Sequence, residues 1–442
     1  MKSVKPKVLH EAAGVTLIDH VLRAVAPLEP SSVIVIIGHQ TETMRGFLSG
    51  RAGLLLAEQE PQLGTGHALL QAEPFLAGQT GDVLLLSGDV PLMRTASLRT
   101  LLQHHRKKQA AATVLTAVFE NPDGYGRIVR KDGAITAIVE HKDASAGERG
   151  IREINSGIYV FALAPLFSSL KQIGAANAQG EYYLPDLVRI FRDRGRTVEA
   201  VALQDAEEIL GVNSRKELAD VSAVLRDRKN AELMAAGVTI VDPATTWIQP
   251  DVVIGADTIL HPGVYLEGRT TVGSGCEIHS GVRIVDSTIG DGVMISNFCV
   301  IRQARVDAGA QIGPFAQLRP ESVVGEGAHI GNFVELKKTT VGKGAKANHL
   351  AYLGDATIGE KVNIGAGTIT CNYDGVNKHP TVIEDGAFIG SDSQLIAPVR
   401  IGRNAYVAAG SSITEDVPPD TLAIARGRQV NKQGWTPRRK KK

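Results

Sequence analysis

Residues 383–401, with the sequence IEDGAFIGSDSQLIAPVRI, carry an aliphatic residue at every sixth position. The same spacing runs from Ile254 to Leu336 with two one-residue slips, and glycine often follows the aliphatic residue, as in Ile389-Gly390. Neither an α-helix nor a single β-strand has a period of six. It is the period of a hexapeptide β-solenoid, in which each unit is a short strand and a corner. We therefore predict a parallel β-helix of hexapeptide repeats over residues 237–442, with the aliphatic side chains stacked inside.

The composition narrows the class of protein. A chain of 442 residues is too long for one ordinary domain, so two or three are expected. Its 48 Lys and Arg residues balance 47 Asp and Glu residues, which argues against nucleic acid or a membrane surface as a partner. Cys276, Cys299 and Cys371 are far apart and odd in number, which predicts no disulfide framework and a reducing cytoplasm. No apolar run reaches the roughly 18 residues of a membrane span.

The first half of the chain has a different pattern, which predicts an α/β domain over residues 1–213. Short apolar runs typical of buried strands occur at 33–37, 83–86 and 113–118, and helical patterns such as 98–108 lie between or after them. Strands that alternate with helices predict a mostly parallel sheet with crossover connections. Ligands then bind beyond the carboxyl ends of the strands.

A long helix is expected between the two domains, over residues 214–236. Ser214 is a candidate N-cap, and Glu217 three residues later completes a capping box. Gly237 suits the position that follows the end of a helix. At 1.5 Å per residue, such a helix forms an arm of roughly 33 Å.

One polar segment interrupts the six-residue repeat. Residues 370–379 read TCNYDGVNKH and fit no hexapeptide unit. A stacked coil can extrude a loop without losing core, so we expect this excursion to serve binding. The basic residues 438–442 at the end of the chain are expected to be a solvated, disordered tail.

The polar residues of the solenoid cluster near this excursion. Arg319 and Lys337 are 18 residues apart, which is one coil of three hexapeptides, so they should stack on one face as a phosphate clamp. His349 lies near the next coil, where a histidine can act as a general base. Flat solenoid sides pair with copies of the same chain, and we expect a homotrimer with sites in the grooves between chains.

Three strings of the solenoid carry a family resemblance: GPFAQLRP at 313–320, GNFVELKK at 331–338 and NIGAGTITCNYDG at 363–375. They resemble the bacterial bifunctional N-acetylglucosamine-1-phosphate uridyltransferase/glucosamine-1-phosphate acetyltransferases. Shorter matches such as QLGTGHA at 62–68 and GDVPL at 88–92 extend the resemblance over essentially the whole chain. It implies an α/β nucleotidyltransferase-like (Rossmann-like) domain, a linker helix and a left-handed parallel β-helix. It also implies synthesis of UDP-N-acetylglucosamine for the cell wall from glucosamine 1-phosphate, acetyl-CoA and UTP.

For the solenoid, the resemblance implies that His349 is the general base on the sugar amine and that Glu335 orients or polarises it. Glucosamine 1-phosphate would be held by Arg319, Lys337, Tyr352 and Asn363. The acetyl-CoA site would be lined by Ala366, Asn372, Tyr373, Ser391, Ala409 and Arg426, with Arg426 on a CoA phosphate. Acyl transfer to an amine needs a base of near-neutral pKa and donors aimed at the developing oxyanion, which these residue types supply. Cys371 is expected to take no part.

For the α/β domain, the resemblance implies a Mg²⁺ ion on Asp89 and Asn213. A hard cation held by one carboxylate and substrate phosphates suits Mg²⁺. Lys7 would contact phosphate or sugar. The uracil would be held by Gln59, Gly64 and Thr65. The amino sugar would be held by Gly126, Glu140 and Asn155.

The chain departs from the family pattern at its start. The family opens with a strand and a glycine-rich Leu-Ala-Ala-Gly-x-Gly-Thr-Arg-Met loop, and Met1 falls at the last residue of that loop. Such a loop cradles a triphosphate with backbone N–H groups, and the strand is central in the sheet. The chain as written is therefore expected to acetylate but to transfer uridylyl groups poorly. Two explanations are open: Met1 is an internal methionine of a longer protein, or the uridylyl half is impaired.

Two other functions are alternatives to the two-step enzyme. One is a monofunctional glucosamine-1-phosphate acetyltransferase with a vestigial nucleotidyltransferase domain. The other is a non-catalytic regulatory scaffold, because similar domain pairs also occur in such subunits. The presence of His349, Asn363 and the Asn372-Tyr373 pair argues against the scaffold.

Overall fold

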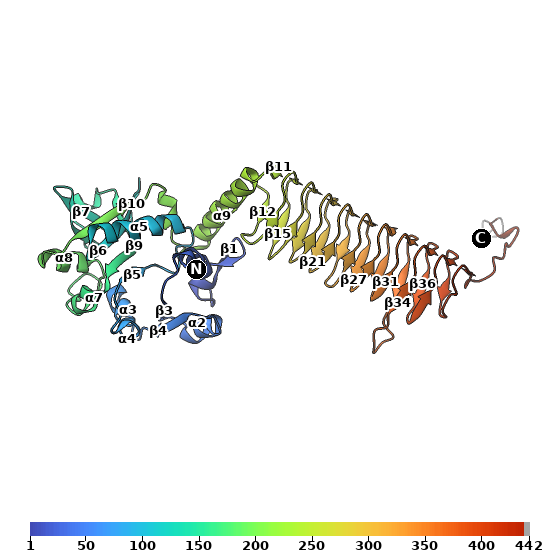
Figure 1. Cartoon of the computed structure of the whole chain (residues 1–442), viewed down its shortest axis with the longest axis horizontal. Helices are drawn as coiled ribbons and strands as arrows, with labels where there is room; N and C mark the ends of the chain where they lie inside the picture. The colour runs from blue at the N-terminus through green and yellow to red at the C-terminus, as the bar shows by residue number, and fades with distance from the viewer. Residues whose placement is uncertain (437–442) are drawn as a thin grey trace. The chain divides into compact units, whose positions relative to one another are not determined.

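The computed structural model describes residues 1–436 and divides the chain into two units, one from Met1 to Leu225 and the other from Arg226 onward (Figure 1). The basic residues 438–442, for which a solvated tail is predicted, lie outside the described residues. Among the described helices, none is long and apolar enough to cross a membrane.

The first unit is an α/β structure built around β9, which pairs with β5, β6 and β7. Its main sheet has the order β10-β6-β9-β7-β8, with β5 attached to β9. The strands of this unit are β1 (Glu11–Ala12), β2 (Val15–Thr16), β3 (Val33–Ile37), β4 (Leu54–Glu58), β5 (Asp82–Leu85), β6 (Ala112–Val118), β7 (Arg127–Lys131), β8 (Ala134–Val139), β9 (Glu153–Ala162) and β10 (Val198–Ala202). Its helices are α1 (Leu17–Val25), α2 (Thr41–Leu48), α3 (Thr65–Leu70), α4 (Glu73–Leu76), α5 (Thr95–Lys108), α6 (Ala146–Arg149), α7 (Leu163–Leu170) and α8 (Asp186–Asp193), with 3₁₀ turns η1 (Lys7–Leu9), η2 (Ala26–Leu28) and η3 (Ala206–Ile209).

Alternate side chains of β9 enter two different cores. Ile158 and Val160 pack in one cluster with Leu98 and Leu101 of α5. Tyr159 and Phe161 pack in another, which contains residues of α7 and α8 such as Phe191. Because successive side chains of a strand point to opposite faces, these clusters place helices on both faces of the sheet.

The prediction of a mostly parallel sheet is wrong. In the main sheet β10 pairs with β6 in parallel, but the pairs of β9 with β5, β6 and β7 and the pair β7–β8 are antiparallel. One of these antiparallel pairs, β7–β8, is a hairpin. Asp132 and Gly133 both have positive φ angles of 52° and 80°, which is the geometry of a tight turn between antiparallel strands. An Asp-Gly pair between apolar runs is the sequence signal of such a turn.

The strands β3 and β5 have open edges in the described structure. β3 pairs with β4 in a separate parallel two-stranded sheet, and β5 pairs with β9 on one side. Most side chains of β3 and all of those of β5 are only half-buried, although both strands are strongly apolar.

The predicted long helix is α9 (Arg215–Ala235). Its N-terminus has the expected capping box: the backbone N–H of Glu217 donates to Ser214 Oγ at 3.1 Å, and the N–H of Ser214 donates to the Glu217 carboxylate at 2.7 Å. Gly237 follows the helix with φ +94°, and the N–H of Val238 donates to the carbonyl of Leu233. The helix therefore begins and ends where its local sequence predicts.

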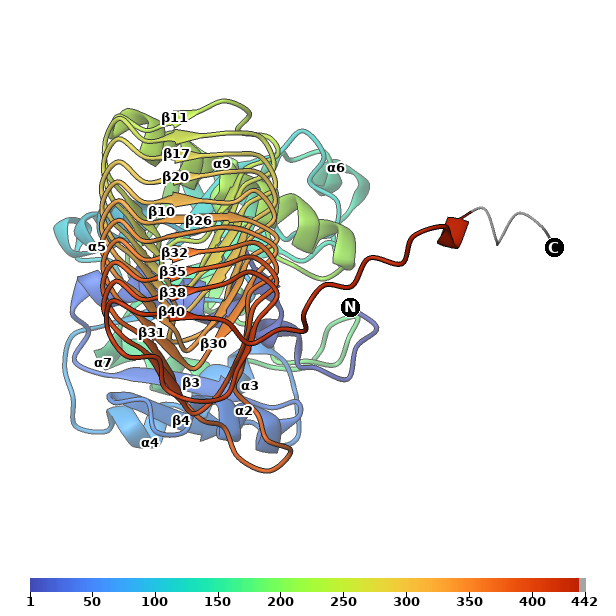
Figure 2. The ribbon, with the colours of Figure 1, turned by 90° about the vertical axis from the view of Figure 1, so that its right-hand side faces the viewer.

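The second unit is a parallel β-helix with three sheets in its described residues. Figure 2 shows the strands of one sheet stacked in order on one side of the coil. The β11 face contains β11 (Thr239–Ile240), β14 (Ile259–Leu260), β17 (Glu277–Ile278), β20 (Met294–Ile295), β23 (Gln311–Ile312), β26 (His329–Asn332), β29 (Lys346–His349), β32 (Asn363–Ile364), β35 (Phe388–Ile389), β38 (Tyr406–Val407) and β40 (Leu422–Ala423).

The β12 face contains β12 (Trp247–Ile248), β15 (Tyr265–Glu267), β18 (Arg283–Val285), β21 (Val300–Arg302), β24 (Gln317–Leu318), β27 (Glu335–Lys337), β30 (Tyr352–Gly354), β33 (Ile369–Cys371), β36 (Gln394–Ile396) and β39 (Ser412–Ile413). The β13 face contains β13 (Val253–Ile254), β16 (Thr271–Val272), β19 (Thr288–Ile289), β22 (Arg305–Val306), β25 (Val323–Val324), β28 (Thr340–Val341), β31 (Ala356–Ile358), β34 (Thr381–Ile383) and β37 (Val399–Ile401).

The aliphatic residues that define the repeat form the core of this unit, as predicted. All of the following are at most 7% exposed: Ile254, Leu260, Leu266, Val272, Ile278, Ile284, Ile289, Ile295, Ile301, Val306, Ile312, Leu318, Val324, Ile330, Leu336, Ile383, Ile389, Leu395, Ile401, Val407 and Ile413. Each stacks on its equivalent one coil away, as Ile254 does on Val272. Adjacent coils also approach closely at Gly331 of β26, where a Cβ would lie 1.9 Å from the carbonyl oxygen of Asn348.

The excursion loop begins two residues later than predicted. Thr370 and Cys371 belong to β33, and the buried Thr370 hydroxyl accepts from Gly354 N–H at 2.7 Å. The loop then runs from Asn372 to the start of β34, with Tyr373 and Lys378 bridged in antiparallel fashion. Its insertion lengthens one coil without breaking the register, because Ile369 still pairs with Gln394.

Candidate active sites

In the first unit, three predicted residues from distant parts of the chain converge. The ammonium group of Lys7 lies 2.5 Å from a carboxylate oxygen of Asp89 and 2.9 Å from the side-chain oxygen of Asn213. Lys7 lies in the turn η1, Asp89 follows β5, and Asn213 precedes α9. The two oxygens therefore face one cation, although 124 residues separate them along the chain.

The residues predicted to hold uracil also lie together. The amide of Gln59 donates to the carbonyl of Gly64 at 2.9 Å, and the Thr65 hydroxyl accepts from the backbone N–H of Leu184 at 3.2 Å. Gly64 has φ +104°, and a Cβ on it would lie 2.9 Å from the backbone of Tyr182. Glycine is therefore required at this position, because any side chain would clash.

The residues predicted to hold the amino sugar form a third cluster. A Cβ on Gly126 would lie 3.2 Å from a Glu140 carboxylate oxygen and 3.3 Å from the Asn155 Cβ. The Asn155 side-chain oxygen accepts from the hydroxyl of the buried Tyr159 at 2.9 Å. Burial raises the pKa of Glu140, with smaller contributions from Asp143 and Asp186. A half-buried carboxyl next to a glycine is a suitable acceptor for sugar hydroxyl or amide groups.

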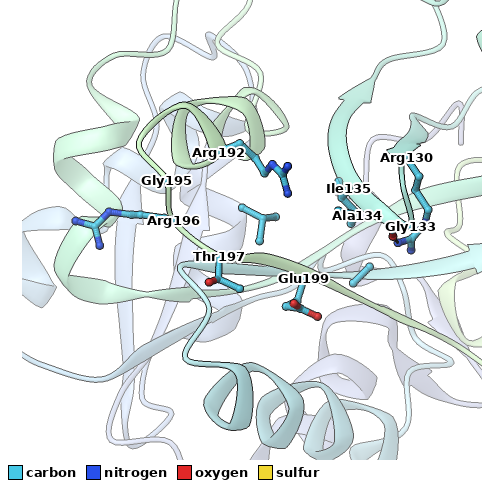
Figure 3. Close-up of a pocket in the computed structure, with 11 residues that line it drawn as sticks. Arg130, Gly133, Ala134, Ile135, Arg192, Gly195, Arg196, Thr197 and Glu199 are labelled. Carbon is cyan, nitrogen blue, oxygen red and sulfur yellow. Dashed lines mark hydrogen bonds between the residues drawn. The ribbon is translucent and has the colours of Figure 1, made fainter.

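A cavity of about 450 Å³ in this unit is a separate feature. Figure 3 shows it between the β7–β8 hairpin, the end of α8 and β10, with Arg130, Arg192 and Glu199 on its wall. None of the predicted nucleotide or sugar residues lines this cavity. The candidate uridyltransferase site is therefore defined by the three clusters above.

In the solenoid, the predicted catalytic histidine and most predicted acetyl-CoA residues share one column. At one corner of the β-helix, a backbone N–H of each coil donates to a backbone carbonyl of the preceding coil. The donors are Leu350, Gly367, Asp392 and Gly410. From coil to coil the column contains Asn332, His349, Ala366, Ser391 and Ala409. Arg426 ends it, since its guanidinium donates to the carbonyl of Ala409 at 2.6 Å. An extended ligand that follows this corner would therefore meet all of these residues in order.

His349 is exposed and is hydrogen-bonded to the residue above it in the column. Its Nδ1 lies 3.1 Å from Oδ1 of Asn332. An amide oxygen only accepts, so in this geometry Nδ1 carries the hydrogen and Nε2 has the free lone pair. Glu335 instead forms an ion pair with Arg319, with a nitrogen–oxygen distance of 2.9 Å. The predicted orientation of His349 by Glu335 stays a prediction.

The predicted phosphate clamp lies on the β12 face. Arg319 and Lys337 occupy equivalent positions of adjacent coils, since the N–H of Arg319 donates to the carbonyl of Leu336. The Lys337 ammonium is 3.1 Å from the Asp355 carboxylate, which also accepts from the amide of the buried Asn372. Burial acts to raise the pKa of Asp355, but the hydrogen bonds from Lys337 and Asn372 outweigh it and hold the pKa low.

The excursion loop brings a third cation to this clamp. Lys378 adjoins Lys337, and this contact together with the charge of Lys337 lowers the pKa of Lys378. Two neighbouring ammonium groups repel each other unless an anion lies between them. The pair Lys337–Lys378 is thus a site that a phosphate dianion would stabilise.

The remaining predicted residues surround these two groups. Tyr352 is the first residue of β30 and pairs with Glu335, and Asn363 is the first residue of β32. Tyr373 is exposed on the excursion loop, where its hydroxyl donates to the carbonyl of Gly375. Burial raises the pKa of the Cys371 thiol, which is unfavourable for a nucleophile. No hydrogen bond or ion pair within the described residues joins His349 to the clamp.

Sequence reasoning gave no role to two residues of this site: Asn332 contacts His349, and Asp355 contacts Lys337. Both could have been found, because Asn332 lies 17 residues before His349 and Asp355 lies 18 residues after Lys337, one coil in each case. Lys378 lies in the excursion for which binding is predicted, but its contact with Lys337 is not predicted. The position of Lys378 depends on how the excursion loop folds, which no periodicity describes.

Two family comparisons match the two units. The MobA-like NTP transferase domain matches residues 1–182, and the bacterial transferase hexapeptide family matches residues 251–286 and 380–415. Together with the two sites, they define a two-domain transferase that joins a nucleotidyltransferase domain to a left-handed parallel β-helix.

Full-length relatives are similar along the whole chain. A bifunctional protein GlmU of Pelobacter propionicus is 50% identical over 100% of this chain and 96% of its own length. The GlmU proteins of Heliobacterium modesticaldum and of an Exiguobacterium species are 51% and 50% identical, over 100% and 99% of this chain and 96% and 97% of their own lengths. The chain belongs to the family of bifunctional GlmU proteins. The predicted resemblance, fold class and pair of transferase activities are confirmed.

The contact between Asn332 and His349 leads to a first prediction for acetyl transfer. Asn332→Ala should lower kcat about 2–10-fold, the worth of one neutral hydrogen bond, because the imidazole loses the acceptor that holds it. Asn332→Asp keeps an acceptor and should restore kcat at alkaline pH. It should also move the acidic limb of the kcat–pH profile to higher pH, since a carboxylate stabilises the imidazolium. Steady-state kinetics across pH measure both effects, with Asn404→Ala as the control. An unchanged kcat in Asn332→Ala would remove this positioning role.

Proposed function

We propose that residues 237–442 transfer the acetyl group of acetyl-CoA to the amine of glucosamine 1-phosphate. Residues 1–213 then transfer a uridylyl group from UTP to the N-acetylated product, which yields UDP-N-acetylglucosamine and pyrophosphate. Residues 214–236 link the two domains. The observation that carries the proposal is the column in which His349 continues into Ala366, Ser391 and Ala409.

In acetyl transfer, His349 Nε2 accepts a proton from the amine of glucosamine 1-phosphate as the nitrogen attacks the thioester carbonyl. The C–N bond forms, the tetrahedral intermediate collapses, and the CoA thiolate leaves and is protonated. A direct attack of this kind needs no acyl-enzyme nucleophile. The CoA chain lies along the corner column, with Arg426 close to its phosphates and Asn372 and Tyr373 beside the reacting end.

The clamp holds the sugar phosphate and does not take part in bond making. Arg319 and Lys337 face the phosphate from adjacent coils, and Lys378 approaches from the excursion loop. Tyr352 and Asn363 flank the sugar between the clamp and His349. Contacts to a non-reacting phosphate contribute binding that is nearly equal in ground and transition states.

In the first unit, Asp89 and Asn213 suit a Mg²⁺ ion. The Lys7 ammonium lies between their oxygens as a stand-in cation, which indicates that a carboxylate and an amide oxygen face one positive centre. Mg²⁺ bound there would neutralise charge on the triphosphate. Lys7 would then bind a phosphate oxygen, with uracil at Gln59, Gly64 and Thr65 and the amino sugar at Gly126, Glu140 and Asn155.

A homotrimer would complete the acetyltransferase site. Phe298, Phe315 and Phe333 stack on successive corners with ring centroids 5.3–5.4 Å apart and remain about half exposed. This apolar strip adjoins the catalytic column, because Phe333 follows Asn332 and Leu350 follows His349. A neighbouring copy that covers the strip would also close the groove over His349.

The free cysteines are consistent with a cytoplasmic location.

Removal of His349 tests the acetyltransferase assignment. His349→Ala should lower acetyl transfer by about 10²–10⁴-fold, the usual worth of a positioned general base. CoA thiol release from acetyl-CoA and glucosamine 1-phosphate gives the rate. His104→Ala, which changes a histidine of the other unit, should leave it unchanged. Near-normal release of CoA by His349→Ala would contradict the assignment.

The role of the clamp can be tested by comparing how a substitution in it changes KM and how it changes kcat. Lys337→Ala should raise KM for glucosamine 1-phosphate by roughly 10–150-fold, the worth of a charge-assisted contact, and should change kcat less. Lys343→Ala, an exposed lysine that pairs with Glu326, is the matched control. A fall in kcat with unchanged KM would place the phosphate elsewhere.

The assembly has its own test. Sedimentation equilibrium of the full chain should give a mass three times that of the 47.0 kDa protomer. Phe315→Glu places a charge in the apolar strip and should shift the mass toward the protomer and lower acetyl transfer together. A monomer in the unsubstituted protein would refute the trimer.

A further inference from the structure

Three side chains near the beginning of the β-helix form a cluster that the transferase sites do not use. His261 follows β14, and His279 occupies the equivalent position of the next coil, after β17. Glu277 opens β17 and lies two residues before His279. The β-helix therefore stacks two imidazoles on adjacent coils and places a carboxylate beside both.

The geometry brings one potential ligand atom from each residue together. A carboxylate oxygen of Glu277 lies 3.0 Å from Nε2 of His261 and 3.5 Å from Nε2 of His279. The two rings are parallel within 4°, with centroids 4.6 Å apart. All three ligand atoms lie within 4.8 Å of one another. Tetrahedral Zn²⁺, with bonds of about 2.0–2.1 Å to nitrogen, needs ligand atoms roughly 3.3–3.5 Å apart. Small side-chain rotations would reach that spacing.

The chemistry of the donors selects a class of ion. Two imidazole nitrogens with one carboxylate suit Zn²⁺ and its transition-metal neighbours, whereas Mg²⁺ and Ca²⁺ prefer oxygen ligands alone. The side chains are 28–40% exposed, which leaves an entry path and room for a water as a fourth ligand. Within the described residues, Glu277 is the only ion-pair partner of either histidine.

We propose that His261, Glu277 and His279 bind a divalent transition-metal ion, with Zn²⁺ as the reference ion. The ion would link two successive coils near the start of the β-helix. Such a link stabilises the folded state, because the three ligands are brought together only when the coils are stacked. The alternative is a metal-free cluster in which Glu277 pairs with a protonated histidine, and the same experiment distinguishes the two.

The test is a calorimetric titration of the full chain with ZnCl₂ after dialysis against EDTA. A millimolar excess of Mg²⁺ keeps Zn²⁺ from the oxygen ligands Asp89 and Asn213. The unsubstituted protein should bind one Zn²⁺ per chain at this site, and Zn²⁺ should raise its thermal transition. His261→Gln and His279→Gln should each weaken binding by at least about 10-fold, because a ligand counts for at least as much as its supporting contacts.

His104→Gln is the matched control, because His104 pairs with Glu199 at 3.1 Å and is similarly exposed but has no second histidine in its pair. It should leave Zn²⁺ affinity unchanged. Binding should also weaken below about pH 6, since protonated imidazole cannot ligate. Equal Zn²⁺ affinity and stoichiometry in the unsubstituted protein and in the double variant H261Q/H279Q would overturn the proposal. No binding to the unsubstituted protein would establish the metal-free cluster instead.

Discussion

The structure of the second unit depends on the inward stacking of one aliphatic side chain every six residues. Leu336, for example, stacks between Leu318 and Leu353, and all three are fully buried. This packing sets the height and angle of every coil, because a shift of one coil would leave voids along the whole stack. The same stacking decides which outward-facing residues lie next to each other in adjacent coils. Arg319 above Lys337, Asn332 above His349 and His261 above His279 are all consequences of this one constraint.

The constraint also explains how a solenoid accommodates a site. The excursion loop extends from one coil, yet the strands on both sides keep their partners, as the pair Ile369–Gln394 shows. The loop therefore adds Lys378 and Tyr373 to a rigid wall that already carries Lys337 and Asp355. Rigid strands position the clamp and the base, and the loop supplies groups that can adjust to a ligand.

The first unit works differently. Its candidate site joins Lys7, Asp89 and Asn213, which come from a turn, a strand end and the segment before a helix. Local spacing relates none of these residues to another. Family resemblance named them, but their meeting depends on how β5, β9 and the crossover segments pack.

The sequence by itself determined every feature that rests on local repetition. The six-residue period predicted the β-helix, its core and the stacking of Arg319 on Lys337, and the Ser214–Glu217 box predicted α9. Tertiary structure alone decided the antiparallel pairings of β9, the adjacency of Lys378 to Lys337 and the convergence on Lys7. The physical reason is that the length of a repeat fixes which residues lie next to each other in adjacent coils. A mixed sheet or an extruded loop obtains its contacts from chain segments whose separation no local period records.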